Sequence, residues 1–498
     1  MSYLEILVAI IFCSLIFILL APNKNTLLFL SWNSPLMKLM PTVYLKSHEL
    51  YDKMTQVLAE NKGTILLKTS WFTNLDTLVT SDPTNVQHVM SSNYQRGSEF
   101  RKAFDFLGDA AFIKDLHEWR EEKKFTHAFY KENQFHKSTP KIIHHTLEKG
   151  LITVLDHALH QNQVINLQNL FNRYMLDATC LLATGFDLGS LRVGFPKAPL
   201  LDAMDDMAEA VFFRHILPER VWRMQRWLRI GKEKKLAEAS VVVHQILGDY
   251  LSKKYENQET CEDFDVLRFY LSEAAGDSKK SIKHAEKTFL VANITTLLFA
   301  GRDTSGALLT WLFYLISTNP LVENKILEEI RQIISPPKHY IFYKAEELSK
   351  LVYLQSALTE SLRLFPPVPV IIRDPIREDV LPSGHKVDQK TKIILCTYAM
   401  GRMPEIWGED CGEFKPERWI SGKGSSGVKH VASNSFLAFG SGQWACPGRE
   451  VAFTRMKAVV ATILHNYHVQ VLEGQRISPS VSALLTMKHG LKATISSR

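Results

Sequence analysis

The stretch Phe439-Gly-Ser-Gly-Gln-Trp-Ala-Cys446-Pro-Gly448, near the carboxyl end of the 498-residue chain, decides how the rest is interpreted. Its glycines allow the backbone to fold tightly and to approach a planar ligand closely. A helical pattern follows directly, so Cys446 precedes a helix amino terminus, where the helix dipole favours a thiolate. A thiolate is the proximal ligand that promotes O–O cleavage at a haem iron. The loop therefore suggests a haem ligand.

Two other interpretations of this loop compete. The segment from Gly440 to Ala445 also fits GxGxxA, a dinucleotide-binding fingerprint. That fingerprint needs a preceding strand and an acidic residue about 20 positions on, and the residues around Asn466 provide none. The other interpretation is an ordinary structural turn. Taken alone, the loop does not decide between a haem ligand and a turn.

Composition excludes several classes of protein. Hydrophobic residues make up 46% of the chain and charged residues 22%, which excludes a disordered, collagen-like or coiled-coil protein. The net charge of +7 is too diffuse to indicate nucleic-acid binding, and it fits a local basic face for an acidic partner or an anionic membrane. The six cysteines are scattered without a CxxC pair, which indicates a reducing compartment.

The amino terminus carries a candidate membrane anchor. Residues 6–21 are apolar except for Ser14, and a helix over residues 3–21 nearly crosses a bilayer core. The positive charge lies downstream, beginning at Lys24, so the rest of the chain should face the cytoplasm. A cleaved signal peptide is the alternative, but its charge would lie on the other flank. We expect an anchor over 1–22, a proline-containing linker over 23–45 and one large domain over 46–498.

Hydrophobic periodicity predicts a mainly helical domain with a small β portion. Four helices are expected over residues 170–184, 200–213, 235–254 and 283–318. Strand-like runs are confined to residues 64–80 and 368–396. Near the middle of the longest expected helix, Gly301 and Gly306 each weaken the helix, and a glycine beside a hydroxyl can open the helical ladder there and leave a pocket.

The cysteine loop resembles the F-x-x-G-x-x-x-C-x-G signature of the cytochrome P-450 haem-thiolate monooxygenases, through Phe439, Gly442, Cys446 and Gly448. Other motifs of that family follow in the expected order. They are Glu360-Ser-Leu-Arg363 for ExxR, Phe414-Lys-Pro-Glu-Arg418-Trp for the PERF segment, Ala300-Gly301-Arg-Asp303-Thr304 for the oxygen-binding motif, and Trp119 to Lys123 for WxxxR. The resemblance extends over about residues 32–490.

This resemblance implies the P-450 fold and haem b, with Cys446 as the axial ligand of the iron. It implies that Thr304 hydrogen-bonds oxygen, that Asp303 supplies protons, and that Ala300 and Gly301 shape the oxygen site. Glu360, Arg363 and Arg418 would form a buried network that holds the fold and takes no part in the chemistry. The remaining residues expected at the haem are Trp119, Lys123, Arg373, Phe439, Gly442, Trp444 and Gly448.

The sequence departs from the family pattern at two of these positions. Lys123 replaces the usual arginine, which keeps the charge and loses bidentate geometry. Trp444 stands where Arg or His commonly contacts a propionate, so an indole N–H could donate one hydrogen bond but no charge. The expected substrate pocket is apolar. Its residues are Phe106, Phe112, Phe299, Val370, Ile371, Leu484 and Met487, with Phe100 and Phe104 nearby.

Stretches such as WNSPLMKLMP and DVLPSGHKV are similar to the plant fatty-acid and alkane hydroxylases, a branch with an offshoot that couples phenolic alkaloids. The expected function is hydroxylation of a long-chain aliphatic substrate, with oxidative phenol coupling of an alkaloid precursor as the alternative. Further alternatives are a rearrangement enzyme, disfavoured by the Asp303-Thr304 pair, and a non-catalytic haem-binding membrane protein.

The resemblance also implies partners and a location. No flavin or nicotinamide motif is present, so electrons should come from NADPH through a membrane-anchored reductase. A basic face for that reductase is expected after Trp119 and after Gly448. Its residues are Arg120, Lys123, Lys124, Arg449, Arg455 and Lys457. We expect a single-pass protein of the endoplasmic reticulum membrane, with its catalytic domain in the cytoplasm and no nucleic-acid partner.

Overall fold

The structure is a computed structural model that describes residues 49–67, 76–92, 94–256, 264–274, 286–333, 344–420, 427–429, 431–432, 434–480 and 482–498. The expected anchor (1–22) and linker (23–45) lie outside these residues. Within the described ranges, no single helix has the length and apolar character to cross a bilayer. The helices α16 (Lys287–Ser317) and α17 (Pro320–Ile333) have the required length and apolar character only when they are taken together. The two helices meet at a bend of 111°.

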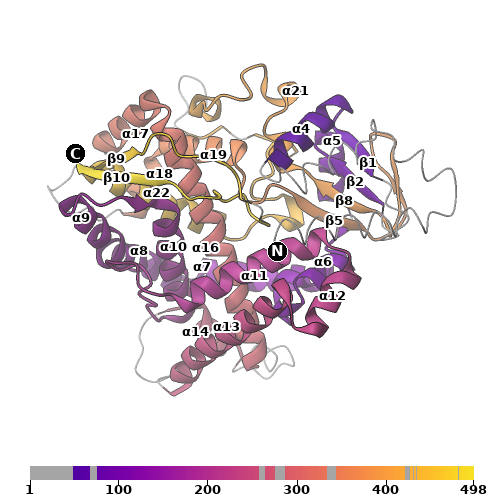
Figure 1. The fold of residues 1–498 in the computed structure, drawn as a ribbon, viewed down its shortest axis with the longest axis horizontal. Coiled ribbons are helices and arrows are strands. Elements are labelled where there is room, and N and C mark those ends of the chain that lie inside the picture. Colours follow the sequence, from indigo (N-terminus) through magenta and orange to yellow (C-terminus); the bar gives the residue numbers. More distant parts are fainter. Residues whose placement is uncertain are drawn as a thin grey trace.

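A five-stranded sheet joins the two regions in which the sequence predicts strands. Its order is β1 (Thr64–Leu67), β2 (Thr77–Thr80), β8 (Lys392–Leu395), β5 (Ile371–Pro375) and β3 (Tyr94–Gln95). Strands β2 and β8 pair in parallel, with Leu78 opposite Ile393. Figure 1 shows this sheet together with α4 (Leu50–Glu60) and α5 (Pro83–Ser91) at one end of the molecule.

The four predicted helices are present with shifted ends. They are α10 (Leu167–Thr184), α11 (Pro199–Ile216), α13 (Gly231–Glu256) and α16. Around them lie α7 (Leu116–Lys131), α8 (Asn133–Thr146), α9 (Thr153–His160), α12 (Glu219–Leu228), α14 (Val266–Ala274), α18 (Ala345–Lys350), α19 (Val352–Leu364) and α22 (Arg449–Asn466). Helix α16 is buried along most of its length, which explains why its sequence is apolar on every side.

The glycines of α16 serve helix packing. A Cβ at Gly301 would lie 2.7 Å from the hydroxyl of Thr179, and one at Gly306 would lie 2.3 Å from the side-chain oxygen of Asn172. Both neighbours belong to α10, so the missing side chains let the two helices approach closely. The helix runs unbroken through both positions. The expectation that a glycine opens the helical ladder is therefore wrong here.

A third β region escaped the sequence interpretation. Strands β4 (Ile165–Asn166), β10 (Lys492–Ser497) and β9 (Tyr467–Val471) form a sheet in that order, at the opposite end of the molecule from the five-stranded sheet (Figure 1). Strand β10 reads KATISS and has only two buried side chains, Ala493 and Ile495, so its apolar alternation is too brief to detect. The short strand β3 also lies outside the predicted strand regions, whereas the two-residue pair of β6 (Asp379–Val380) with β7 (Lys386–Val387) lies within 368–396.

Candidate functional site

The cysteine loop is a tight turn that ends at the start of α22. Gly440 and Gly442 have φ of +67° and +56°, the left-handed region that favours glycine. A Cβ at Gly440 would also lie 2.5 Å from the carbonyl oxygen of Trp444. The amide of Cys446 donates a hydrogen bond to the carbonyl of Phe439 over 2.7 Å. The loop thus returns on itself and places Cys446 three residues before α22 begins at Arg449.

Cys446 is accessible, whereas Cys180 and Cys396 are buried and Cys411 is partly buried. Protein still surrounds much of the Cys446 side chain, and this burial raises the pKa of its thiol above the ordinary value. The N–H of Gly448 and the charges of Lys123 and Arg449 act in the opposite direction. The N–H at the helix terminus thus favours the thiolate in the predicted direction, but burial has the larger effect on the pKa. A coordinated metal cation would produce the thiolate, because it deprotonates its thiol ligand.

Helix α7 holds the loop from one side. Trp119 donates its indole N–H to the carbonyl of Gln443 over 2.9 Å. The ammonium of Lys123 donates to the same carbonyl over 3.1 Å and to that of Gly442 over 3.3 Å. Both residues were expected to contact haem propionates. In the structure their donors bind the backbone of the cysteine loop.

A buried cationic and aromatic cluster lies beside the loop; we call its residues, Arg96, Trp119, Arg373 and Trp444, the arginine–tryptophan cluster. The rings of Trp119 and Trp444 stack, with their planes 14° apart and centroids separated by 6.0 Å. The Cζ of Arg96 lies 4.9 Å from the Trp444 ring centroid, and that of Arg373 lies 4.4 Å from it. Arg96 also donates to the carbonyl of Phe112. Sequence reasoning missed Arg96, because no motif marks it.

This cluster fits the carboxylates of a haem. Burial lowers the pKa of Arg373 to about 10, and burial together with the charge of Arg373 lowers the pKa of Arg96. The buried Nε of Arg373 and the indole N–H of Trp444 have no hydrogen-bond partner among the described residues. Two adjacent buried cations, with two buried donors beside them that lack partners within the described ranges, call for an anion. The propionates of a haem bound at the accessible Cys446 would neutralise these cations and accept hydrogen bonds from these donors.

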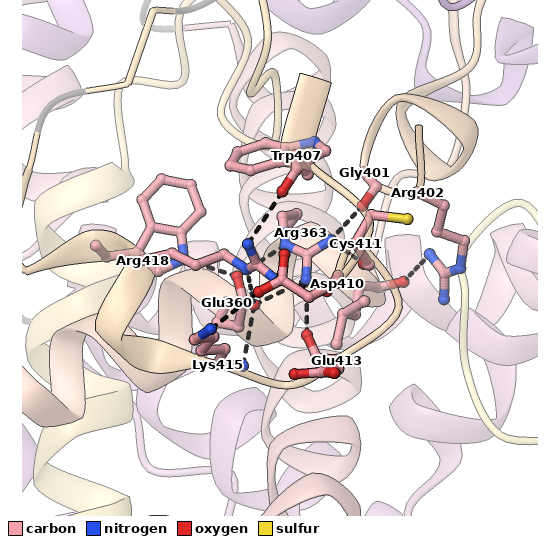
Figure 2. A network of polar contacts seen from close by, with 12 residues as sticks. Glu360, Arg363, Gly401, Arg402, Trp407, Asp410, Cys411, Glu413, Lys415 and Arg418 are labelled. Carbon is pink, nitrogen blue, oxygen red and sulfur yellow. Dashed lines mark hydrogen bonds and ion pairs between the residues drawn. The ribbon is translucent and has the colours of Figure 1, made fainter. Parts of the chain in front are cut away.

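Glu360 and Arg363 form the centre of a buried polar network, shown in Figure 2. Arg363 donates from Nε and Nη2 to the two oxygens of Glu360, over 2.8 and 2.7 Å. Arg418 adds a third cationic donor at 3.2 Å. Arg363 also donates to the carbonyls of Cys411 and Glu413, so α19 secures the segment around residues 411–413. The structure brings the three expected residues together.

Trp419 is a further member of this network. Its indole N–H donates to Oε2 of Glu360 over 2.8 Å, and its side chain is only 2% exposed. The sequence signal was available, because a buried indole N–H needs an acceptor and Trp419 follows directly after Arg418.

The acid–alcohol pair lies on α16 in two different surroundings. Asp303 is buried and forms an ion pair with its neighbour Arg302. Burial raises the pKa of Asp303 to about 6, and Arg302 opposes this rise. Thr304 is partly accessible, and its hydroxyl donates to the carbonyl of Ala300 over 2.6 Å. Ala300 and Thr304 are one turn apart and present an accessible strip on a largely buried helix.

Only some of the expected pocket residues lie together. Phe112 packs against Phe104 and Phe100, with ring centroids 5.3 and 5.6 Å away, and Phe106 contacts Phe299 of α16 edge to face at 6.2 Å. Elsewhere, Val370 and Ile371 pack against the cores beside the sheet. Leu484 is partly buried. Met487 lies in the main helical core, 2% exposed, and its backbone bonds to Gln168 of α10.

The expected basic face needs a correction at two residues. Arg455 is 4% exposed and donates to the Thr179 hydroxyl over 3.1 Å, and Lys457 is 5% exposed and donates to the carbonyl of Leu348 over 2.9 Å. Neither can contact a partner from these positions. The other expected residues, Arg120, Lys123, Lys124 and Arg449, remain at least partly accessible.

Comparison with known proteins agrees with this geometry. The family model described as Cytochrome P450 matches residues 33–495. The alkane hydroxylase MAH1 of Arabidopsis thaliana is 38% identical over 475 residues, which is 94% of this chain and 93% of that protein. The noroxomaritidine synthase of Narcissus aff. pseudonarcissus MK-2014 is 34% identical, covering 100% of this chain and 97% of that protein. Cytochrome P450 86B1 of Arabidopsis thaliana is 33% identical over 90% of this chain and 82% of its own length.

The family model covers nearly the whole chain, and the cysteine loop, the Glu360 network and the arginine–tryptophan cluster lie within it. A P450 uses haem b and takes its electrons from NADPH through a partner reductase. The chain belongs to the cytochrome P450 family and is a haem-dependent monooxygenase.

Proposed function

We propose that this P450 hydroxylates a long-chain aliphatic substrate, a fatty acid or an alkane. The observation that carries the proposal is the 38% identity with an alkane hydroxylase over nearly the full length of both chains. The balanced reaction consumes the substrate, one O2, two electrons and two protons, and yields the alcohol and one water. The chain must therefore deliver two protons for each turnover and keep bulk water from competing.

Cys446 is the residue we assign to the iron. It is accessible, and the hydrogen bond from its own amide to Phe439 fixes the loop. Arg373 and Trp444 would hold the propionates with the two donors that lack partners among the residues the structure describes, and Arg96 would add its charge. When bound, the haem supplies the iron at which O2 is reduced and its bond is cleaved.

Thr304 and Asp303 are the residues we assign to proton delivery. The Thr304 hydroxyl is accessible and can exchange its hydrogen bond to Ala300 for one to oxygen or water. Asp303, with a pKa of about 6, is poised to take up and release a proton near neutrality. Asp303 precedes Thr304 on α16 and is buried, so its proton is held on the same helix as the accessible hydroxyl.

A cluster of five phenylalanines supports an apolar substrate; its residues are Phe100, Phe104, Phe106, Phe112 and Phe299. Phe106 and Phe299 join the loop of residues 104–113 to α16 one residue before Ala300, so apolar side chains adjoin the accessible strip of Ala300 and Thr304. Such a surface binds hydrocarbon by burying it from water.

Oxidative phenol coupling is the second candidate, favoured by the full-length similarity to noroxomaritidine synthase. In the same cluster, Phe100, Phe104 and Phe112 can stack on aromatic rings as well as on an alkyl chain. Coupling removes two hydrogen atoms from the substrate and adds no oxygen to it, which separates it from hydroxylation.

We further propose that the enzyme works at the endoplasmic reticulum membrane, facing the cytoplasm, with the reductase docking beside α7. An exposed patch on α12 and the residues after it supports contact with lipid. Trp227 is 81% exposed there, and Met224, Leu228 and Ile230 are exposed beside it, among Arg220 and Arg223. Aromatic and aliphatic side chains mixed with arginine are typical of helices that lie at a lipid surface.

The test uses the full-length protein with reductase, NADPH and 18O2. The substrates are a long n-alkane, the fatty acid of the same length and a phenolic alkaloid. We expect a Soret shift with the aliphatic compounds and a product that carries one labelled oxygen. A product lighter by two hydrogen atoms and without label, formed from the alkaloid alone, would replace the proposal with phenol coupling.

A further inference from the structure

One guanidinium is shared by two carboxylates of different exposure. Arg302 is buried, 2% exposed, and reaches from α16 to α11. It forms ion pairs with Asp303, its neighbour on α16, and with Asp205 on α11. Its Nη1 also donates to the carbonyl of Leu201 over 3.2 Å. The guanidinium therefore has a fixed place, set by the α11 backbone.

The two carboxylates differ in their contact with water. The side chain of Asp205 is 60% exposed, and that of Asp303 is 5% exposed. Arg302 binds Oδ1 of Asp303, while Oδ2 is buried and has no partner among the described residues. A buried acceptor without a partner is costly when the group is ionised. That cost falls when Oδ2 carries a proton.

Two ionisable groups act on Asp303. Arg302 lowers its pKa and Asp205 raises it, while burial has the largest effect and raises it. Because Arg302 also pairs with Asp205, its charge is divided between the two acids. An undivided guanidinium would lower the pKa of Asp303 further toward its ordinary value.

We propose that Arg302 is a positioning residue and that Asp205 sets the proton affinity of Asp303 by taking part of the charge of Arg302. The arrangement anchors Asp303 through one oxygen and leaves the other to carry the proton that the reaction consumes. Asp205 thus acts from the solvent side of α11 without touching oxygen or substrate. This inference rests on the proposed role of Asp303 in proton delivery.

The sharpest variant is Asp205→Asn, because Asp205 is exposed and its replacement leaves the buried ion pair intact. Its matched control is Asp206→Asn, the adjacent carboxylate on α11, which pairs with Lys235 of α13 at 3.1 Å. We expect the Asp205 variant to lower the proton affinity of Asp303 by about 0.5 to 1 pH unit. The Arg302→Gln variant should shift it in the opposite direction.

The measurement has two readouts on the haem-loaded enzyme. The first is the pH dependence of the protonated-carboxyl infrared band, assigned to Asp303 by its loss in Asp303→Asn. The second is the pH dependence of product formed per NADPH, with the balance recovered as hydrogen peroxide. We expect Asp205→Asn to shift both profiles toward acid, Asp206→Asn to shift neither, and Arg302→Gln to shift the band toward alkali.

Failure of this inference and failure of the proposed proton role of Asp303 would give different results. An Asp303 band that titrates identically in the wild type and in Asp205→Asn overturns this inference. A band that shifts while the coupling of Asp303→Asn equals that of the wild type supports the divided charge and overturns the proposed proton role of Asp303. Equal shifts in the Asp205 and Asp206 variants would also overturn the inference, because loss of any negative charge on this surface of α11 would then explain the effect.

Discussion

The guanidinium of Arg373 lies over the indole of Trp444, with its Cζ 4.4 Å from the ring centroid. Arg96 lies over the same ring, so one indole serves as a platform for two buried cations. A tryptophan at this position cannot supply the charge that an arginine or histidine would. It instead packs against two arginines that do, and its own N–H has no hydrogen-bond partner in the part of the chain that the structure describes.

The first prediction separates these two contributions of Trp444. Trp444→Phe keeps a ring under the arginines and loses the N–H, while Trp444→Ala loses both. We expect the Phe variant to release haem to apomyoglobin about tenfold faster, the loss expected for one hydrogen bond to a charged group. The Ala variant should release it faster still. Trp227→Phe, at an exposed site, is the control, and haem release from Trp444→Phe at the wild-type rate would contradict the role of the N–H.

The second prediction concerns the Glu360 network. Trp419→Phe removes one donor from a carboxylate whose side chain is 0% exposed, which should lower the free energy of unfolding by about 1.5–3 kcal/mol. Arg363→Leu leaves Glu360 without its main cation and should cost about 3–5 kcal/mol. Urea unfolding measures both. Lys415→Gln removes only an exposed ion pair with Asp410 and should leave the unfolding midpoint unchanged. If Lys415→Gln lowered the free energy of unfolding as much as the other two variants, burial of the Glu360 network would not be the cause of their effect.

The third prediction tests the reductase face. Lys124 is 75% exposed on α7, and Lys124→Glu should raise the reductase concentration needed for half-maximal turnover, more strongly at low salt. Lys234→Glu makes the same charge change on α13, where the side chain is 59% exposed, and should have little effect. Equal effects of the two reversals would mean that net charge, and not this face, governs docking.

The fourth prediction follows from the burial of Lys457. Burial lowers its pKa from the ordinary 10.5 to about 8. Between these values the unfolded chain binds more protons than the native protein, so this residue makes stability rise as pH increases from about 8 to 10.5. Lys457→Met removes that contribution. The stability of the wild type relative to this variant should therefore improve over that range, whereas the exposed Lys350→Met should give a constant difference; a flat difference for both variants would refute the burial effect.

Local motifs carried most of the site predictions made from the sequence. Cys446, Glu360, Arg363 and Thr304 lie in short patterns whose spacing is itself the signal, and long buried helices such as α16 show their apolar character directly. Contacts between segments distant in the sequence were harder to predict. Arg96 joins the cluster only because β3 pairs with β5, the strand that carries Arg373. Nothing in the residues near Arg96 reveals that pairing.

The errors on α22 have a physical cause. The sequence predicts Arg455 and Lys457 on a basic face because charged side chains usually reach solvent. The helix is packed on nearly all sides, and its sequence shows this through apolar residues at 456, 458, 459 and 460 around both charges. Gly301 was misinterpreted for a related reason, since its close neighbour Thr179 belongs to another helix.

The central claim is that Cys446 binds the haem iron through its thiolate. The most direct measurement is the absorption spectrum of the reduced, CO-bound protein, compared between the wild type and Cys446→Ser. We expect a band at about 450 nm, the wavelength in the family's name, in the wild type and its loss in a variant that still contains haem. A Cys446→Ser protein that kept the 450 nm band would contradict the assignment.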